Sequence, residues 1–388
     1  MKRRSLLAGV GALALTASLG FGLDGAATQE GPIRIAALYN LTGGMSSIDA
    51  PALRGAQLKA EQVNKAGGVL GGRMVEIVPY DTRTDQAATA TAAQEAVSEG
   101  VVAGIGYGDT TFVMAAAPTF QQEGIPFVTS GATHPMLPSW VGDCMFMTAF
   151  GDDDQSYAIA DYAIDKLGMK RVVVWTDQSM DFTKALSQFF KERFGERGGE
   201  IVAEDSFMMG DTDFSAQIAR LDAIEPAPDG VFISAIPSEA GITVRQIREA
   251  GLDLPILSGD GFDTPLVADV PGPELANDVY FSTHTFRADN RPEVQSFIEA
   301  YEAKFDTPPE NAFAPLGYDA VGLVVNAIEK AGSAEPQAIC EALRETRGYT
   351  AVTGEISYTR ASMVPPKPIS IIAVQGGEYE VVEIWRPE

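Results

Sequence analysis

The sequence is poor in histidine, cysteine and basic residues, and each shortage narrows the possible functions. Its 388 residues include two histidines, two cysteines, and 28 lysines and arginines against 53 acidic residues, a formal net charge of −25. A surface with this charge repels phosphate backbones and anionic lipids, so we expect no nucleic-acid partner. The histidines and cysteines stand at no short spacing, so we expect no metal site.

Motifs of the common enzyme classes are also missing. The sequence has no G-x-S-x-G elbow, no H-E-x-x-H motif and no P-loop, and Gly104-Ile105-Gly106 is too short for a dinucleotide fingerprint. The acidic run at 152–154 suggests calcium, but it stands where a helix begins, and acids there suit the helix dipole. We therefore expect a binding protein without a cofactor, not an enzyme.

The first residues have the pattern of an export signal. A basic start at 2–4 precedes an apolar stretch at 6–23, and the small residues at 25–27 offer cleavage after Ala27. The alternative is a single transmembrane anchor. The arginine pair suits the twin-arginine route, and Sec export fits equally well. We expect residues 1–27 to be a signal peptide, and the mature protein to lie in the periplasm.

Cys144 and Cys340 are far apart in the chain. An oxidising compartment permits a disulfide between them, which would close a long loop. Two buried thiols are the alternative, and the sequence leaves both open.

Apolar runs alternate with helical segments along most of the chain. Runs such as VVVW and GVFISAI are continuously apolar, as expected of parallel strands covered on both faces. The length exceeds one ordinary core. The pattern therefore predicts an α/β fold of two lobes with doubly wound parallel sheets, closed by three helices and an antiparallel set. Strands are expected at 33–41, 74–80, 101–107, 126–130, 171–176, 200–207, 230–236, 255–258, 355–358, 369–374 and 378–385.

Two polar segments follow strands of the first lobe. Open α/β sheets bind ligands outside the carboxyl ends of their strands. Thr110 and Thr111 offer hydroxyls where a helix begins, and Gly131, within the SGAT segment at 130–133, lets a ligand approach the backbone. Together they predict a cradle for a carboxylate or another small anion. The alternatives are that Thr110 is only an N-cap and that the SGAT segment is only a loop.

With these segments the sequence resembles a known family. Three motifs look like those of the branched-chain amino-acid-binding proteins. They are YNLTGGMSSIDAPALRGAQLKAEQVNKAGGVLGGRMVEIVPYDT, GIPFVTSGATHP and APLGYDAVGLVVNAI. These are extracytoplasmic solute receptors of ABC transporters with the type I periplasmic binding fold. The resemblance implies two lobes joined by three hinge crossovers, with residues 28–151 and 283–358 in the N-lobe and 152–282 and 359–388 in the C-lobe.

The resemblance also implies the roles of the site residues. Hydroxyl and backbone groups of the cradle would hold a ligand carboxylate, an aromatic residue of the C-lobe would cover the ligand, and an acid would pair with its ammonium. The candidate ligand-binding residues are Thr110, Thr111, Ser130, Gly131, Thr133, Phe182 and Asp260. Asp260 is the implied partner of the ammonium, although its glycine-flanked position also suits a turn.

Three positions depart from the family pattern. Ile236 stands where a tyrosine is common, Phe182 lacks a tyrosine hydroxyl, and Ile48 replaces an aromatic residue. The resemblance, with these departures, leads us to expect an amino acid or a related small carboxylate as the ligand, delivered by a monomer to an ABC permease. The alternative is a periplasmic sensor for a small amide or aromatic carboxylate. We expect His134 to stabilise the turn that follows it, whereas His284, near a crossover, could gate closure or reach the ligand.

Overall fold

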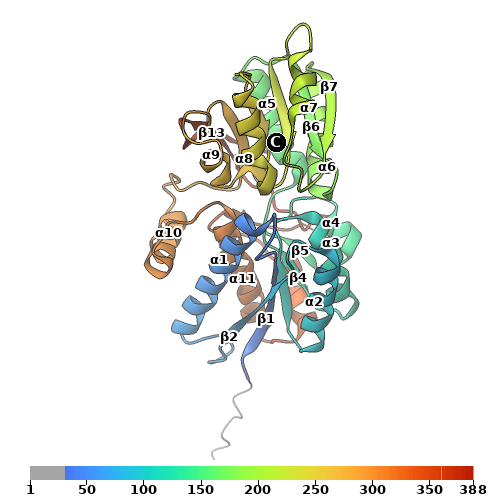
Figure 1. Cartoon of the computed structure of the whole chain (residues 1–388). Coiled ribbons are helices and arrows are strands. Elements are labelled where there is room, and N and C mark those ends of the chain that lie inside the picture. Colours follow the sequence, from blue (N-terminus) through green and yellow to red (C-terminus); the bar gives the residue numbers. More distant parts are fainter. Residues whose placement is uncertain (1–30, 360, 388) are drawn as a thin grey trace, which may run out of the picture. The chain divides into compact units, whose positions relative to one another are not determined.

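The computed structural model describes residues 31–359 and 361–387, and the predicted signal peptide lies outside these residues. From Pro32 onward the chain forms one compact unit. Its described part contains two large β-sheets, each with helices on its faces, so the structure confirms the predicted α/β class with two doubly wound lobes (Figure 1).

The first sheet is built from the early βα units of the described chain. Its five strands are all parallel, in the order β2-β1-β3-β4-β5. The order reverses between β1 and β3, and this is the point at which open α/β sheets bind ligands. The strands are β1 (Ile33–Tyr39), β2 (Val75–Asp81), β3 (Ala103–Gly106), β4 (Phe127–Thr129) and β5 (Met145–Met147), and the helices between them are α1 (Ser46–Lys65), α2 (Gln86–Ser98), α3 (Thr110–Gln122) and α4 (Leu137–Val141).

The second sheet has seven strands in the described residues, in the order β14-β13-β10-β9-β8-β6-β7. Strands β6 to β10 pair in parallel, and β13 and β14 add an antiparallel edge. The antiparallel pairing of these two strands was predicted, whereas the strand predicted at 355–358 instead forms a separate hairpin with residues 349–351. The strands are β6 (Arg171–Asp177), β7 (Glu200–Phe207), β8 (Gly230–Ser234), β9 (Ile256–Ser258), β10 (Val279–Thr283), β13 (Ile369–Gln375) and β14 (Glu378–Trp385); the helices are α5 (Asp152–Asp165), α6 (Asp181–Glu196), α7 (Ser215–Asp222), α8 (Pro237–Glu249), the 3₁₀ turn η1 (Asp260–Phe262) and α9 (Leu266–Asp269).

A late segment of the chain returns to the first sheet. Leu316, Leu343 and Ile356 belong to the same hydrophobic cluster as β1 and β3, whereas Ile369 packs with the second sheet. Figure 1 shows α11 beside α1, although the two helices are far apart in sequence. The elements of this segment are α10 (Pro292–Phe305), α11 (Phe313–Ala331), α12 (Pro336–Arg344), β11 (Tyr349–Ala351) and β12 (Gly354–Ile356).

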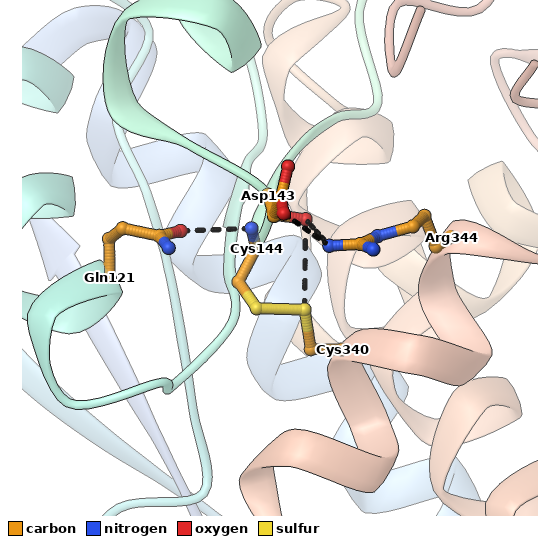
Figure 2. Close-up of a disulfide and its surroundings, with 5 residues drawn as sticks. All are labelled: Gln121, Asp143, Cys144, Cys340 and Arg344. Atoms are coloured by element: carbon orange, nitrogen blue, oxygen red, sulfur yellow. Dashed lines mark hydrogen bonds and ion pairs between the residues drawn. A yellow bond between two sulfur atoms is a disulfide. The ribbon is translucent and has the colours of Figure 1, made fainter. Parts of the chain in front are cut away.

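A disulfide fixes this returning segment to the first sheet. Cys144, directly before β5, is bonded to Cys340 of α12, with 5.4 Å between their Cα atoms. Figure 2 shows the surrounding contacts: the Cys144 N–H donates to the side-chain oxygen of Gln121, and Arg344 donates to the carbonyl of Asp143. Of the two possibilities that the sequence left open, the structure contains the disulfide.

Three strands were not predicted: β5, β10 and β11. β5 and β11 are three residues long, and β10 is five residues long, so none is long enough to give a clear periodic signal in the sequence. Their strand character comes from pairing with β4, β9 and β12, respectively. In the described residues no helix is both long enough and apolar enough to cross a bilayer.

Candidate functional site

The carboxyl ends of several strands carry buried polar atoms without a hydrogen-bond partner. A buried polar group that lacks a partner costs free energy, so such groups mark either strain or a place for a ligand. We call this set the unpaired belt. It comprises Asp109 Oδ2, Thr110 Oγ1, Thr133 Oγ1, Asp152 Oδ2, Asp177 Oδ2, His284 Nδ1 and Thr285 Oγ1.

At the start of α3, the neighbouring residues Asp109, Thr110 and Thr111 have different hydrogen-bonding roles. Asp109 is the N-cap, since its carboxylate accepts the Thr111 N–H at 2.6 Å. Thr110 is therefore not the cap, and its buried hydroxyl is unpaired. The Thr111 hydroxyl accepts the backbone N–H of Asp181 at 2.9 Å, which joins α3 of the first lobe to α6 of the second.

The SGAT segment is used mainly inside the fold. The Gly131 and Ala132 N–H groups both donate to the Tyr107 carbonyl. The Ser130 hydroxyl accepts from Tyr39 at 3.1 Å. A Cβ at Gly131 would lie 2.7 Å from the Phe313 ring, so a side chain, not a ligand, makes the close approach. The role of Gly131 in ligand binding stays a prediction.

The hydroxyl of Thr133 is what the SGAT segment leaves unpaired. Of the predicted cradle, the hydroxyls of Thr110 and Thr133 are therefore the groups that could still hydrogen-bond to a ligand. His134 lies directly after it, and its Nδ1 accepts the Met136 N–H at 3.2 Å while its ring packs on Trp140. His134 thus stabilises the following turn, as expected.

Phe182 packs within the second lobe. Its side chain is buried in the core of the second lobe, with Leu186 and Phe190, and touches the space above Gly261. Contact between Phe182 and a ligand stays a prediction. Two other apolar side chains of the second lobe, Met180 and Ile236, belong to the hydrophobic cluster of the first lobe. The sequence analysis did not single out Met180 because it looked for an aromatic residue in this segment and found Phe182 two positions away.

Asp260 is buried and fully engaged. Its Oδ2 lies 3.0 Å from His284 Nε2, and its Oδ1 accepts from the Gln155 amide at 3.2 Å. The His284 ring stacks on Phe150 at 3.8 Å between centroids, and burial lowers the His284 pKa. The predicted acid is thus at the site, but its oxygens already have protein partners.

Asp152 is the acid that the sequence reading missed. Its N–H donates to the Thr133 carbonyl at 2.7 Å, and its Oδ1 accepts from Gln155 at 2.9 Å, which leaves Oδ2 unpaired. Burial raises the Asp152 pKa well above its usual value, and burial also raises the pKa of Asp109 to about 7. Helical spacing offered a signal, because positions 152, 155, 156 and 159 share the buried face of α5.

The described residues contain no cluster of histidine, cysteine or acidic side chains suited to a metal ion. Two doubly wound lobes, with unpaired polar groups at the carboxyl ends of their strands, define a two-lobed receptor for a small ligand.

Comparison with known proteins places the chain within that class. Residues 32–378 match the periplasmic binding protein family, and the chain belongs to it. The structure is similar to the branched-chain amino acid transporter substrate-binding protein LivJ of Streptococcus pneumoniae, solved with isoleucine, at 30% identity and a TM-score of 0.85, covering 92% of this chain and 100% of that one.

Further relatives agree. The leucine-binding protein LivK of Thermotoga maritima is 33% identical, with a TM-score of 0.85, over 92% of this chain and 99% of its own. Leu/Ile/Val-binding protein homolog 3 of Brucella melitensis is 27% identical over 96% of this chain and 98% of its own. The predicted resemblance to the branched-chain amino-acid-binding proteins is confirmed. This family consists of extracytoplasmic receptors and is not an enzyme family.

Proposed function

We propose that this chain is the solute receptor of an ABC importer and that it binds an amino acid with an apolar side chain. The unpaired belt carries the proposal, because Thr110 and Thr133 offer buried hydroxyls to a polar ligand. Met180 and Ile236 add apolar surface from the second lobe. Relatives named for leucine, isoleucine and valine binding, and LivJ with its isoleucine, support the same ligand class.

The lobes would close on the ligand as a hinge. We assign residues 28–151 and 283–358 to the N-lobe and residues 152–282 and 359–388 to the C-lobe. The contacts that join elements of different lobes include Asp181 N–H with Thr111 Oγ1, and Thr264 Oγ1 with Ser47 Oγ at 3.3 Å. Contacts of this kind form only when the lobes meet, so they favour the closed state.

The receptor would act as a monomer and without catalysis, and a membrane permease would recognise the closed form. Residues 1–27 would direct export and be removed after Ala27, by the Sec or the twin-arginine route. Intact mass measurement of the exported protein tests this, because the mature chain should begin at Thr28. A retained leader would instead favour a membrane anchor.

A thermal-shift screen of the mature protein tests the ligand class. It compares the twenty amino acids with aliphatic and aromatic carboxylates that lack an amine. We expect apolar amino acids to raise the melting temperature, since a ligand at a hundred times its Kd stabilises the folded state by about 2.7 kcal/mol. A response confined to amine-free carboxylates would refute the amino-acid proposal.

Substitution of Thr110 locates the site. Thr110→Val keeps the shape and removes one unpaired hydroxyl, so we expect binding to weaken by about 1–2 kcal/mol, roughly tenfold, in calorimetric titration. Thr119→Val, on the same helix but without a place in the unpaired belt, serves as the control and should bind like the wild type. Equal affinities for both variants would place the ligand elsewhere.

A further inference from the structure

The described part of the chain contains a cavity between the two lobes that is separate from the candidate site. Its volume is about 300 Å³, and pockets for small molecules typically measure about 300–1,000 Å³. None of the candidate ligand-binding residues lines it, whereas Thr285 of the unpaired belt does. The cavity is therefore a second place for a small molecule, distinct from the cradle of Thr110 and Thr133.

The walls of this cavity belong to different lobes. One wall contains Ala268 and Tyr379, which pack with the core of the second sheet. The other wall contains Phe297 and Ile298 of α10, which pack in one cluster with Leu58 of α1. Because α1 covers the first sheet, the width of the cavity depends on how the two lobes are placed.

Hydrogen bonds at the rim of the cavity hold its walls at their present distance. The Asp263 carboxylate accepts the Ala312 N–H at 2.9 Å, and the Thr264 hydroxyl donates to that of Ser47 at 3.3 Å. Asp263 and Thr264 precede α9 of the second lobe, whereas Ala312 precedes α11 and Ser47 lies in α1. A molecule that touches both walls binds best at this spacing, so it favours the same closed arrangement of the lobes.

The lining of the cavity is mainly apolar and suits a ring with one polar group. Phe286, Phe297 and Pro308 offer flat apolar surfaces. Thr285 is 6% exposed, and its hydroxyl has no hydrogen-bond partner among the described residues. Since a buried hydroxyl without a partner is costly, a ligand that accepts a hydrogen bond from Thr285 gains from meeting it.

The charged residues of the lining disfavour an anion. They are Asp263, Asp269, Glu310, Glu378 and Arg287. Arg54 pairs with Glu310, which leaves three acids against one arginine. Burial raises the pKa of Asp263 to about 6, so its ionised carboxylate is already costly at neutral pH. A negatively charged ligand would add to this cost, whereas a neutral N–H donor would reduce it.

We propose that this cavity is a second ligand site for a small, uncharged aromatic molecule with an amide or a similar hydrogen-bonding group, and that its occupation strengthens amino-acid binding in the cradle. The ligand carbonyl would accept from the Thr285 hydroxyl, and its N–H groups would face the acids of the lining. The coupling rests on the receptor function proposed above, whereas the site itself does not.

Benzamide and benzoate are matched probes of the site, because they share a ring and differ in charge. In NMR titrations of the mature protein, benzamide should bind at least about tenfold more tightly than benzoate. Ile298→Trp fills the cavity and should abolish benzamide binding. Glu299→Trp places the same side chain at the next, exposed position outside the lining, so this control should bind like the wild type.

A second variant removes the hydroxyl and leaves the shape of the cavity. Thr285→Val should weaken benzamide binding by about tenfold and should not lower the melting temperature, because the lost hydroxyl has no protein partner. Thr119→Val, outside the lining, is its control. The second site is refuted if benzoate binds as tightly as benzamide, or if both Ile298→Trp and Thr285→Val bind benzamide like the wild type.

Reciprocal titrations test the coupling. With benzamide at saturation, the Kd of the amino acid with the largest shift in the screen above should fall by about fivefold, and that amino acid should lower the Kd of benzamide by the same factor. Competition between the two would place benzamide in the cradle and overturn the proposal, and unchanged Kd values would overturn the coupling. A protein that binds benzamide but no amino acid would refute the receptor function and leave the second site standing.

Discussion

Removing the disulfide is expected to cost the mature protein about 3–5 kcal/mol of its free energy of unfolding. The bond joins residues separated by 196 positions, and a cross-link of this span removes much conformational freedom from the unfolded chain. It also fastens α12 to β5, a three-residue strand at the edge of the first sheet. Cys144 and Cys340 are both buried, so replacement leaves a small change in packing beside the lost link.

Urea unfolding of the double variant Cys144→Ala/Cys340→Ala measures this loss as a lower transition midpoint. The wild type treated with reductant is the control, because it should unfold at nearly the same midpoint as the variant if the bond itself is responsible. A variant that unfolds with the oxidised wild type would show that packing of α12 alone holds the returning segment in place.

The alternation of strands and helices was predictable because both faces of each parallel strand are covered. Such strands must be apolar along their whole length, and β3, β4 and β8 are buried at every position. β5 could not be predicted in the same way. Three residues carry no period, and its place in the sheet depends on β4 and on a disulfide partner almost two hundred residues away.

The sequence predicted where the candidate site lies in the fold, but not which of its polar groups have protein partners. Thr110, Thr133 and Asp260 lie at strand ends or just beyond them, as the sheet topology required. Which acid of the run at 152–154 is buried depends on how α5 sits on its neighbours, and the composition of the run does not reveal it. The engagement of Asp260 by His284 is a contact between distant segments, which spacing along one chain cannot show.

Gly55→Ala is expected to destabilise the first lobe strongly. A Cβ at Gly55 would lie 1.8 Å from the Ala314 carbonyl oxygen, and one at Gly317 would lie 1.9 Å from the Ala52 carbonyl oxygen. Helices α1 and α11 thus meet backbone to backbone, and a carbonyl cannot turn aside as a side chain can. The helices must move apart, at a cost of about 3 kcal/mol or more.

Gly195→Ala is the matched control, because it also lies inside a helix, α6, with nothing within 4 Å of the added carbon. Better helix propensity should make this variant about 0.5–1 kcal/mol more stable than the wild type. Urea midpoints of the two variants therefore move in opposite directions. A Gly55→Ala variant as stable as the wild type would mean that α1 and α11 separate freely.

Gly55→Ala should also change the shape of the candidate binding site. Phe313 opens α11 and packs against Gly131, and it directly precedes Ala314, which faces Gly55. Helix α1 is tied to this end as well, since Asn311 donates to the Ser47 carbonyl at 2.9 Å. If α11 shifts to admit the new methyl group, Phe313 shifts with it. Gly55→Ala should therefore weaken ligand binding in calorimetric titration, at a temperature where the variant is still folded, whereas Gly195→Ala should not.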